Sequence, residues 1–450
     1  MHIGIKQPRV RALLGRLLEA ALRAADPVEA VGHCVRRTDH ILSIGRHRYD
    51  LRDYGRVLVI GSGKASALMA AALEDRLGSR LEGGLVVVKY GHIAPTKKIA
   101  VVEAGHPVPD RAGLSATTRL LGLIGSLTPD DLLFVLLSGG ASSLLPAPVP
   151  GVTLAEKQRT TDLLLRSGAT IQEINGVRKH LSTIKGGRLL TATRARVVGL
   201  ILSDVLGDDL SSVGSGPTAP DPTTYADACN VLRRYGIWRS VPLSVRAHLL
   251  RGQRGKEKET PKPGSSLFRR AQNQFIGNNR AAVEAVAQEA KRVGMHPLLL
   301  TSALTGEARE AAKMLGSIAR EIVSSSRPVA RPALVIAGGE LTVTFKRATG
   351  TARGKGGRAQ EFALAAAREI AGLPRVWIAA FGTDGTDGPT DAAGAVVDGR
   401  TVAEALQAGL SPVNVLARHD SYRFFKKVGG HIVTGPTGTN VNDLYLLLVL

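Results

Sequence analysis

The sequence predicts an α/β protein with two domains. Short apolar segments, typical of strands that are buried on both faces, alternate with longer helical patterns. The chain has 450 residues, more than one hydrophobic core usually supports, and 44% of them are hydrophobic. Glycine is abundant, with 51 residues, and several glycine-rich loops follow the apolar segments directly. We therefore expect strands that deliver loops and side chains to one rim of each sheet.

The first expected sheet strand ends in a glycine loop. An Arg-rich helix is expected over residues 9–24, where Glu19 and the continuous pattern favour a structural helix over a transit peptide. A strand over residues 56–60 then runs into Gly61-Ser62-Gly63-Lys64, and a helix follows over residues 67–73. A strand, a glycine loop and a helix in this order point backbone N–H groups at an anion. Lys64 adds a positive charge to that site.

The same loop lacks the spacing of a Walker A motif and the third glycine of a dinucleotide fingerprint. The next strand, over residues 85–88, ends in Lys89-Tyr90 and not in the acid that would hold a ribose. A dinucleotide site is therefore disfavoured.

Two further strands end in polar loops. The strand over residues 132–137 leads into Ser138-Gly139-Gly140-Ala141-Ser142, which is not a GxSxG motif and so indicates an anion cradle before a nucleophile elbow. The strand over residues 197–202 leads to Asp204, a candidate Mg²⁺ ligand or base, and then to a donor-rich turn around Ser215.

Basic residues gather between these two strands. Arg178, Lys185 and Arg188 would share a face if one helix carried them, and Arg178 and Lys185 are candidates to bind a phosphate or substrate anion. The alternative is a solvated charged helix.

Composition suggests where the domains divide. Residues 253–272 are charged and rich in Pro, Gly and Ser, so they are the expected linker between domains over residues 1–252 and 273–450. The second domain is expected to contain the following elements: helices over 279–293, 303–323 and from Arg358 onward, strands over 297–301, 333–337, 376–380 and 445–450, and a basic loop over 350–357.

An acidic loop over residues 381–397 follows one of these strands. It carries Asp384, Asp387 and Asp391 among glycines and threonines. Clustered carboxylates on a strand-end loop can bind Mg²⁺ or accept a proton from a substrate hydroxyl. A surface turn with Asp side chains bonded to local N–H groups is the alternative, which the other glycine-rich strand ends disfavour.

Charge and cysteine content limit the classes of function. The net charge of +21 suits nucleic acid, but the basic residues are spread along the chain and no aromatic-interleaved basic patch is present, which favours attraction of small anions. Two cysteines without a metal-ligand spacing indicate a reducing, cytoplasmic compartment. No apolar run reaches the roughly 18 to 20 residues of a membrane span. Anion cradles, carboxylates and mobile cations at strand ends indicate phosphoryl transfer, or hydrolysis or isomerisation of a phosphorylated metabolite.

Eight motifs in order are similar to those of the glycerate 2-kinase family, whose C-terminal part is the MOFRL domain: GSGKAS, LLSGGASSLL, NGVRKHLS with KGGRL, SDVLGDDLSSVGSGPT, IAGGE, GKGGRAQE, FGTDGTDGPTDAAGA and TGPTGTNVNDL. The resemblance spans nearly the whole chain. It implies an N-terminal Rossmann-like domain, a smaller C-terminal α/β domain and an active site in the cleft between them. It also implies ATP-dependent, Mg²⁺-assisted phosphorylation of D-glycerate at the 2-hydroxyl.

The strand-end motifs and the resemblance together assign roles to residues. The expected catalytic residues are Lys64 and Arg358, which face the transferring phosphoryl group, and Asp384 as base or metal ligand. Three carboxylates are expected at the metal: Asp204, Glu340 and Asp387. The residues expected to hold substrate or phosphate are Gly61, Ser62, Gly63, Ser138, Gly139, Gly140, Ser142, Arg178, Lys185 and Ser215. Two positions depart from the family pattern, because Ala359 follows Arg358 where Asn is usual and Leu341 follows Glu340.

Other functions stay open at this point. A kinase that attacks the 3-hydroxyl or a related hydroxy acid, an NADP-dependent oxidoreductase and a nucleic-acid-binding protein are the alternatives, although the last two leave the acidic loops unexplained. The expected partners are D-glycerate and ATP, without nucleic acid or membrane, and the expected assembly is a homodimer.

Overall fold

The computed structural model describes residues 1–345 and 354–450, so residues 350–353 of the expected basic loop over residues 350–357 lie outside the described residues. The chain forms two compact units, one of residues 27–276 and one of residues 1–26 together with 277–450. Each unit is built on its own sheet. Two domains were expected from the chain length, and the α/β architecture is confirmed.

The unit of residues 27–276 is built on a six-stranded sheet with the order β10-β9-β8-β5-β6-β7. The pairs β5–β6, β5–β8, β6–β7 and β8–β9 are parallel. Every residue of β5 and β8 is buried, which is why these strands are apolar throughout. The strands are β5 (Val57–Ser62), β6 (Gly83–Lys89), β7 (Ile99–Ala104), β8 (Leu132–Leu137), β9 (Arg196–Leu202) and β10 (Ala271–Gly277).

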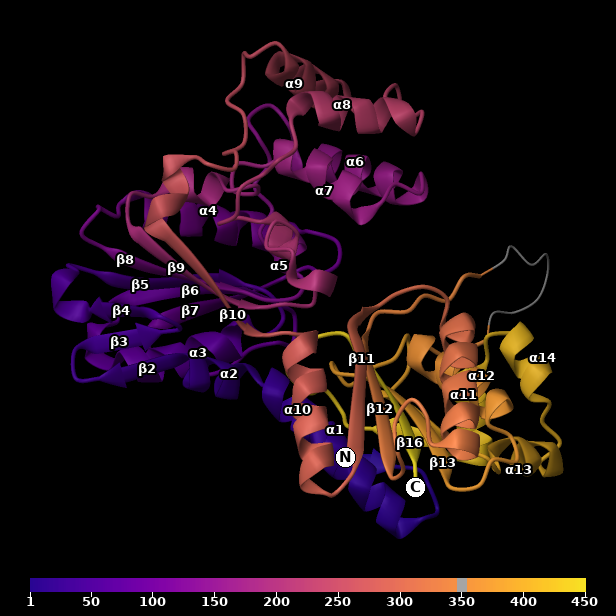
Figure 1. The fold of residues 1–450 in the computed structure, drawn as a ribbon. Helices are drawn as coiled ribbons and strands as arrows, with labels where there is room; N and C mark the ends of the chain where they lie inside the picture. The colour runs from indigo at the N-terminus through magenta and orange to yellow at the C-terminus, as the bar shows by residue number, and fades with distance from the viewer. Residues whose placement is uncertain (346–353) are drawn as a thin grey trace. The chain divides into compact units, whose positions relative to one another are not determined.

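Helices cover both faces of this sheet (Figure 1). One face carries α4 (Arg111–Gly125) and α5 (Ala141–Leu144), whose apolar residues join the buried core of the strands. The other face carries α2 (Pro27–Cys34), α3 (Ser66–Leu77) and a small antiparallel sheet of β2 (Val35–Thr38), β3 (Ile41–Ile44) and β4 (His47–Asp50). Short 3₁₀ turns connect these parts: Leu51–Asp53, Gly78–Arg80, Arg188–Ala192, Leu206–Asp208, Val213–Ser215 and Ser266–Arg270.

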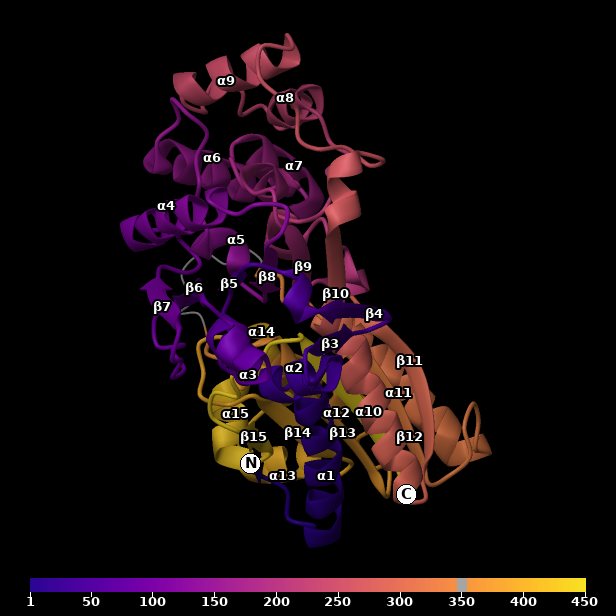
Figure 2. The same cartoon turned by 90° about the vertical axis from the view of Figure 1, so that its left-hand side faces the viewer.

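A separate group of helices rises from the same unit, as Figure 2 shows. It consists of α6 (Leu154–Arg166), α7 (Ile171–His180), α8 (Tyr225–Arg234) and α9 (Leu243–Gln253), and it has its own hydrophobic core around Val177, Tyr225 and Leu249. We call it the helical subdomain.

Residues 253–272, expected as a linker, are bound into the unit of residues 27–276. Glu259 lies 2.8 Å from the ring of His180, and Arg270 donates to the carbonyl oxygen of Thr193 at 2.6 Å. The charged side chains that gave this segment a linker-like composition therefore make specific contacts within the unit.

The second unit is built on a seven-stranded mixed sheet with the order β1-β15-β14-β13-β16-β12-β11. β11 and β12 are parallel, and the other pairs are antiparallel. The C-terminal strand lies inside the sheet between β12 and β13, as its apolar sequence predicted. The strands are β1 (His2–Ile3), β11 (His296–Leu304), β12 (Ala333–Gly339), β13 (Val376–Gly382), β14 (Gly394–Asp398), β15 (His431–Val433) and β16 (Asp443–Val449).

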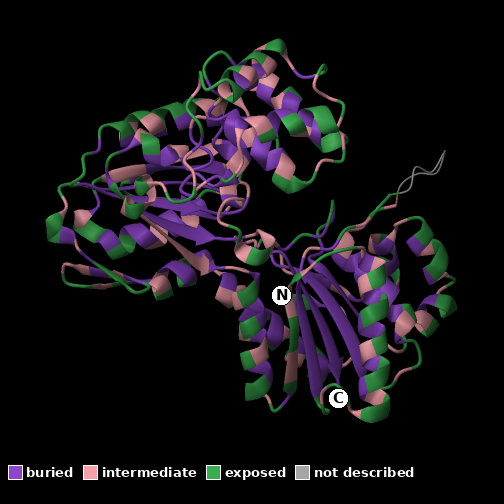
Figure 3. Cartoon of the chain, turned by 45° about the horizontal axis from the view of Figure 1, so that its top comes forward, coloured by how far each residue is buried: buried purple, intermediate pink, exposed green. Residues whose placement is uncertain are grey.

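Two layers of helices enclose this sheet (Figure 3), and its central strands β12, β13 and β16 are buried throughout, whereas the edge strand β11 is partly exposed. One layer consists of α1 (Pro8–Ala25) and α10 (Asn279–Arg292). The other consists of α11 (Ala308–Ser325), α12 (Arg358–Glu369), α13 (Thr401–Gln407), α14 (Pro412–Ala417) and α15 (Ser421–Val428). None of the helices among the described residues is long and apolar enough to cross a membrane.

The first helix belongs to this second unit and not to the N-terminal one, which differs from the expected boundary. Arg16 of α1 forms an ion pair of 2.6 Å with Glu289 of α10, and Thr439 donates to the carbonyl oxygen of Ala25 at 2.5 Å. The apolar face of α1, with Leu14, Leu17 and Leu18, is fully buried. Amphipathicity predicts a helix but does not say which sheet it covers.

Candidate active site

The two glycine loops of the 27–276 unit lie side by side, because β5 and β8 are parallel neighbours in register. The backbone N–H of Lys64 donates to the carbonyl oxygen of Gly139 at 2.8 Å, and that of Ala65 donates to the Ser138 hydroxyl at 3.1 Å. Gly63 has φ +135°, and a Cβ there would lie 2.1 Å from the Ser138 hydroxyl oxygen. Glycine is therefore required at this position. The backbone of Lys64 is held by these hydrogen bonds, which fixes the position from which its side chain extends.

Ser142, Lys185 and Ser215 also come together. The Lys185 ammonium group donates to the Ser142 carbonyl oxygen at 2.7 Å and to its hydroxyl at 3.0 Å, and the two serine hydroxyls lie 2.8 Å apart. Ser215 is bonded in turn to Asn175 at 3.3 Å. Burial, followed by the charges of Arg178 and Lys157, holds the pKa of Lys185 well below its usual range. An anion bound nearby would favour its charged form.

The expected shared helical face of three basic residues is wrong. Helix α7 ends at His180, so Arg178 lies on the helix while Lys185 lies in the loop after it. Arg188 lies in a 3₁₀ turn, where its guanidinium donates to the Tyr225 hydroxyl and to the carbonyl oxygens of Ser182 and Lys258. Arg188 therefore holds the helical subdomain together. The expected helical spacing does not apply, because the helix ends at His180, before Lys185 and Arg188.

Asp204 lies against the second glycine loop. A Cβ at Gly139 would come within 2.3 Å of an Asp204 carboxylate oxygen, so a larger residue there would displace the Asp204 side chain. On the other side, a Cβ at Gly140 would lie 2.7 Å from the His106 ring. Burial and the charges of Lys64 and Lys89 lower the pKa of His106 to about 4, so its ring is neutral at pH 7. Sequence reasoning missed His106, because a single histidine that is distant in sequence from Gly140 does not indicate that the two lie in contact.

A second group of charged residues lies at one edge of the seven-stranded sheet. The register pairs Asp443 of β16 with both Gly339 and Gly382, so β12 and β13 end where β16 begins. Arg358, the first residue of α12, reaches this edge. Its guanidinium forms a fork on the Asp443 carboxylate at 2.5 and 3.1 Å and a third bond to Glu340 at 2.7 Å.

Asp443 is the residue that sequence reasoning missed here, although its motif was recognised. It is buried, and the Tyr445 hydroxyl donates to it at 3.0 Å. Burial raises the pKa of Asp443, against the lowering effect of the bonds from Arg358. A bidentate pair with one buried partner fixes the plane of the guanidinium. The antiparallel register could have identified Asp443, but the register is not readable from one sequence.

Asp387 occupies the N-terminus of α12. Its two carboxylate oxygens accept bonds from the backbone N–H groups of Ala359 at 3.0 Å and Gln360 at 2.8 Å, and the Gln360 side chain donates at 3.0 Å. Burial raises the pKa of Asp387 to about 6, opposed by these bonds. The carboxylate thus caps the helix that carries Arg358. Ala359 takes part through its backbone alone, and its methyl group is buried.

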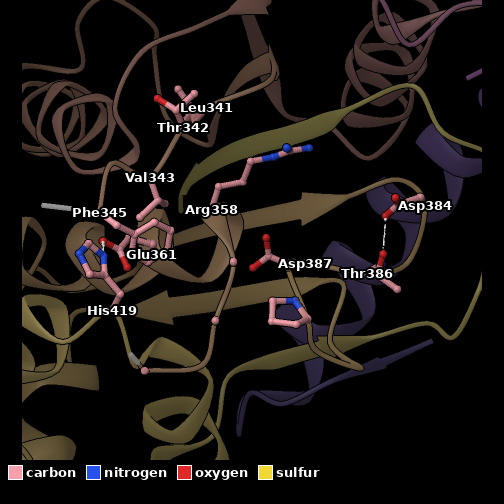
Figure 4. A pocket seen from close by; sticks show the side chains of 15 residues that line it. Leu341, Thr342, Val343, Phe345, Arg358, Glu361, Asp384, Thr386, Asp387 and His419 are labelled. Carbon is pink, nitrogen blue, oxygen red and sulfur yellow. Dashed lines mark hydrogen bonds and ion pairs between the residues drawn. The ribbon is translucent and has the colours of Figure 1, made fainter. Parts of the chain in front are cut away.

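A cavity of about 500 Å³ opens beside these residues. Figure 4 shows Arg358, Asp387 and Asp384 around it, with Asp384 apart from the others and bonded to Thr386. The Asp384 carboxylate accepts from the Thr386 N–H at 3.0 Å and hydroxyl at 3.1 Å. The opposite wall carries His419 and Glu361, which are 3.0 Å apart, while Leu341 joins the hydrophobic core.

The three expected metal ligands are divided between the two units. Asp204 belongs to the 27–276 unit, Glu340 is bound to Arg358, and Asp387 caps α12. Within residues 1–345 and 354–450, no three Asp, Glu, His or Cys side chains lie close enough to hold a metal ion. Mg²⁺ in phosphoryl-transfer sites is held by one or two carboxylates and the substrate phosphates. Asp384, whose carboxylate accepts hydrogen bonds from Thr386 of its own loop among the described residues, is a candidate for one such carboxylate.

Asp387 and Asp384 should differ in what they contribute, which gives a matched pair of variants. Asp387→Ala leaves buried N–H groups of Ala359 and Gln360 without acceptors, and we expect a loss of about 2 to 3 kcal/mol in the free energy of unfolding. Asp384→Ala should cost less than about 1 kcal/mol. Urea denaturation of both variants tests this. Equal losses would contradict the capping role of Asp387.

Comparisons with known proteins cover nearly the whole chain. Residues 13–250 match the model of a domain of unknown function, DUF4147, and residues 333–443 match the MOFRL family. A protein of Pyrococcus horikoshii named glycerate 2-kinase is 44% identical over 98% of this chain and 97% of its own length. A protein of Agrobacterium vitis named putative hydroxypyruvate reductase is 43% identical over 98% of this chain and 94% of its own.

A solved structure gives the same picture. The crystal structure of a glycerate kinase from Thermotoga maritima superposes with a TM-score of 0.87, is 40% identical, and is matched over 99% of this chain and 100% of that one. The similarity extends over the sequences of both units and is not limited to a single shared domain.

Proposed function

We propose that this chain, which belongs to the glycerate kinase family with its DUF4147 and MOFRL regions, is an ATP-dependent glycerate 2-kinase. The product would be 2-phosphoglycerate. The observation that carries the proposal is the position of Arg358, fixed by Asp443 and Glu340 beside a cavity that Asp384 also lines. An oriented cation and a carboxylate at one cavity suit phosphoryl transfer, in which catalysis is positioning and charge neutralisation.

The proposed roles follow from the chemistry of each side chain. Lys64 and Arg358 would neutralise charge on the transferring phosphoryl group, and Asp384 would accept the proton of the glycerate hydroxyl or hold the metal. The loops of Gly61, Ser62 and Gly63 and of Ser138, Gly139 and Gly140 would lie against the bound oxyanions. The N–H groups of Gly63 and Ser138 already donate to the carbonyl oxygens of Val87 and Ser62. ATP supplies the phosphoryl group, and Mg²⁺ on its phosphates neutralises part of their charge.

Phosphorylation of the 2-hydroxyl, and not of the 3-hydroxyl, is the finer part of the proposal. Attack from the 2- or the 3-hydroxyl depends on how the substrate is oriented within a few tenths of an ångström. The name of the Pyrococcus horikoshii relative supports the 2-position.

A coupled assay tests the reaction and its position together. The purified protein receives ATP, Mg²⁺ and D-glycerate, and the product passes directly to enolase with no mutase present. We expect a signal that requires both Mg²⁺ and D-glycerate, because enolase accepts 2-phosphoglycerate and not the 3-isomer.

The other outcomes of this assay identify the alternatives. ADP formation without an enolase signal would contradict the 2-position and indicate the 3-hydroxyl or another acceptor. A parallel reaction with hydroxypyruvate and NADPH tests the activity in the name of the Agrobacterium vitis relative. Oxidation of NADPH without ADP formation in the first assay would reject the kinase.

A further inference from the structure

A second cavity, of about 490 Å³, lies within the 27–276 unit between the start of α6, helix α7 and the loop at residues 107–109. Its wall is fixed, because Gln158 of α6 donates to the carbonyl oxygen of Pro109 at 2.6 Å. Much of its lining is apolar, with Val108, Pro146 and Leu154. Ser142, Lys157 and Arg178 provide polar groups.

Lys157 is an unusual residue in this lining. Only 7% of its surface is exposed, and its ammonium nitrogen has no hydrogen-bond partner among the described residues. Arg178, which lines the same cavity, is partly exposed. Burial of a cation without a partner costs several kcal/mol. A bound anion would offset this cost by supplying the missing negative charge.

Among the described residues that line the cavity, no carboxylate compensates these cations. Lys185, whose pKa is lowered by the charges of Arg178 and Lys157, donates hydrogen bonds to oxygens of Ser142 and Gly214. Asp162, in the lining, is paired at 2.9 Å with the exposed Arg166. Glu156 is committed to the cap of α6 and to Ser244. Of the remaining charged groups nearby, Arg159 is exposed and His106 is neutral at pH 7. The net charge of the cavity is therefore positive.

We propose that this cavity is a subsite for a small carboxylate or phosphate anion, which Lys157 and Arg178 bind directly while Lys185 and Ser142 support it from behind. Ser142 connects it to the loop of Ser138, Gly139 and Gly140, which is bonded to Lys64. D-glycerate as the ligand rests on the proposed function; the anion site itself does not.

Binding is linked to a proton. Burial, followed by the charge of Arg178, lowers the pKa of Lys157 to about 7, so at pH 8 the free protein holds this amine mostly neutral. A bound anion favours the ammonium form and raises that pKa. Anion binding at pH 8 must then take up a proton, whereas at pH 6 the proton is already present. The dissociation constant should rise by up to about tenfold per pH unit above pH 7.

The test is isothermal titration calorimetry on the whole protein with two probes whose charge is constant from pH 6 to 8: D-glycerate and sulfate. Titrations at pH 8 in buffers of different ionisation enthalpy give the number of protons taken up. In Lys157→Met we expect binding to weaken about tenfold or more at pH 6.5 and proton uptake to vanish. Lys256→Met, which removes an exposed charge from the same unit, should change neither.

The outcomes separate the subsite from the proposed function. Lys157→Met replaces a buried charge by an apolar side chain of similar length, so its melting temperature should not fall. Uptake with D-glycerate identifies a substrate carboxylate site, and uptake with sulfate alone identifies a phosphate site; either supports the proposal. Unchanged binding of both probes in Lys157→Met would overturn it, even if the protein phosphorylates glycerate. Proton-linked binding in a protein without kinase activity would keep the subsite and reject the kinase.

Discussion

Replacement of Lys64 by methionine is expected to lower kcat by about 10²- to 10³-fold, with a small change in the Michaelis constants. The ammonium group is proposed to meet charge that develops in the transition state, so its loss affects the chemical step more than ground-state binding. The fold should tolerate the change, because the position of this residue is set by its backbone bond to Gly139 and not by its side chain.

The control for this variant is Lys97→Met, which removes an exposed lysine of the same unit. Both variants lower the net charge by one, so a general effect of charge on substrate attraction would appear equally in each. Steady-state kinetics with ATP and D-glycerate, at two ionic strengths, provide the measurement. A near-normal kcat in Lys64→Met would reject the assignment of this residue.

Local sequence signals predicted the elements that carry the candidate site. The strands that end at Ser62, Leu137 and Leu202 are buried on both faces, so their apolar runs were unambiguous. Because parallel neighbours end at the same edge, glycine loops that follow such strands were expected to meet, and the loops at Gly63 and Ser138 do so. Their proposed roles in binding remain predictions.

Long-range pairing could not be predicted from the same signals. Asp443 lies opposite Gly339 and Gly382 only because β16 runs between β12 and β13, and the strand order depends on the whole chain. Lys157 reads as one charged residue on an amphipathic helix, and its burial results from the packing of α6 on the 107–109 loop. Likewise, nothing within α1 indicates that its apolar face packs on α10 in the other half of the sequence.

Replacement of Arg358 by methionine is expected to lower kcat by about 10³-fold, because a guanidinium aimed at a transferring phosphoryl group is among the strongest contributors to such reactions. It should also destabilise the protein by about 3 kcal/mol, since Asp443 is then left buried without its cation. The ion pair of the exposed Arg423 with the partly buried Asp420 gives the control, and Arg423→Met should cost less than about 1 kcal/mol.

The pH dependence and a second substitution separate the two effects of Arg358. Burial already raises the pKa of Asp443 above its ordinary value, and loss of Arg358 raises it further. A carboxyl group with a raised folded-state pKa favours the folded protein at low pH and loses that contribution as pH rises. The destabilisation of Arg358→Met should therefore be larger at pH 8 than at pH 5.

Asp443→Asn in the same molecule removes the unpaired charge, so the double variant should recover much of the stability while kcat stays low. Recovery of kcat together with stability would show that Arg358 acts only by holding the fold, and would reject its catalytic role.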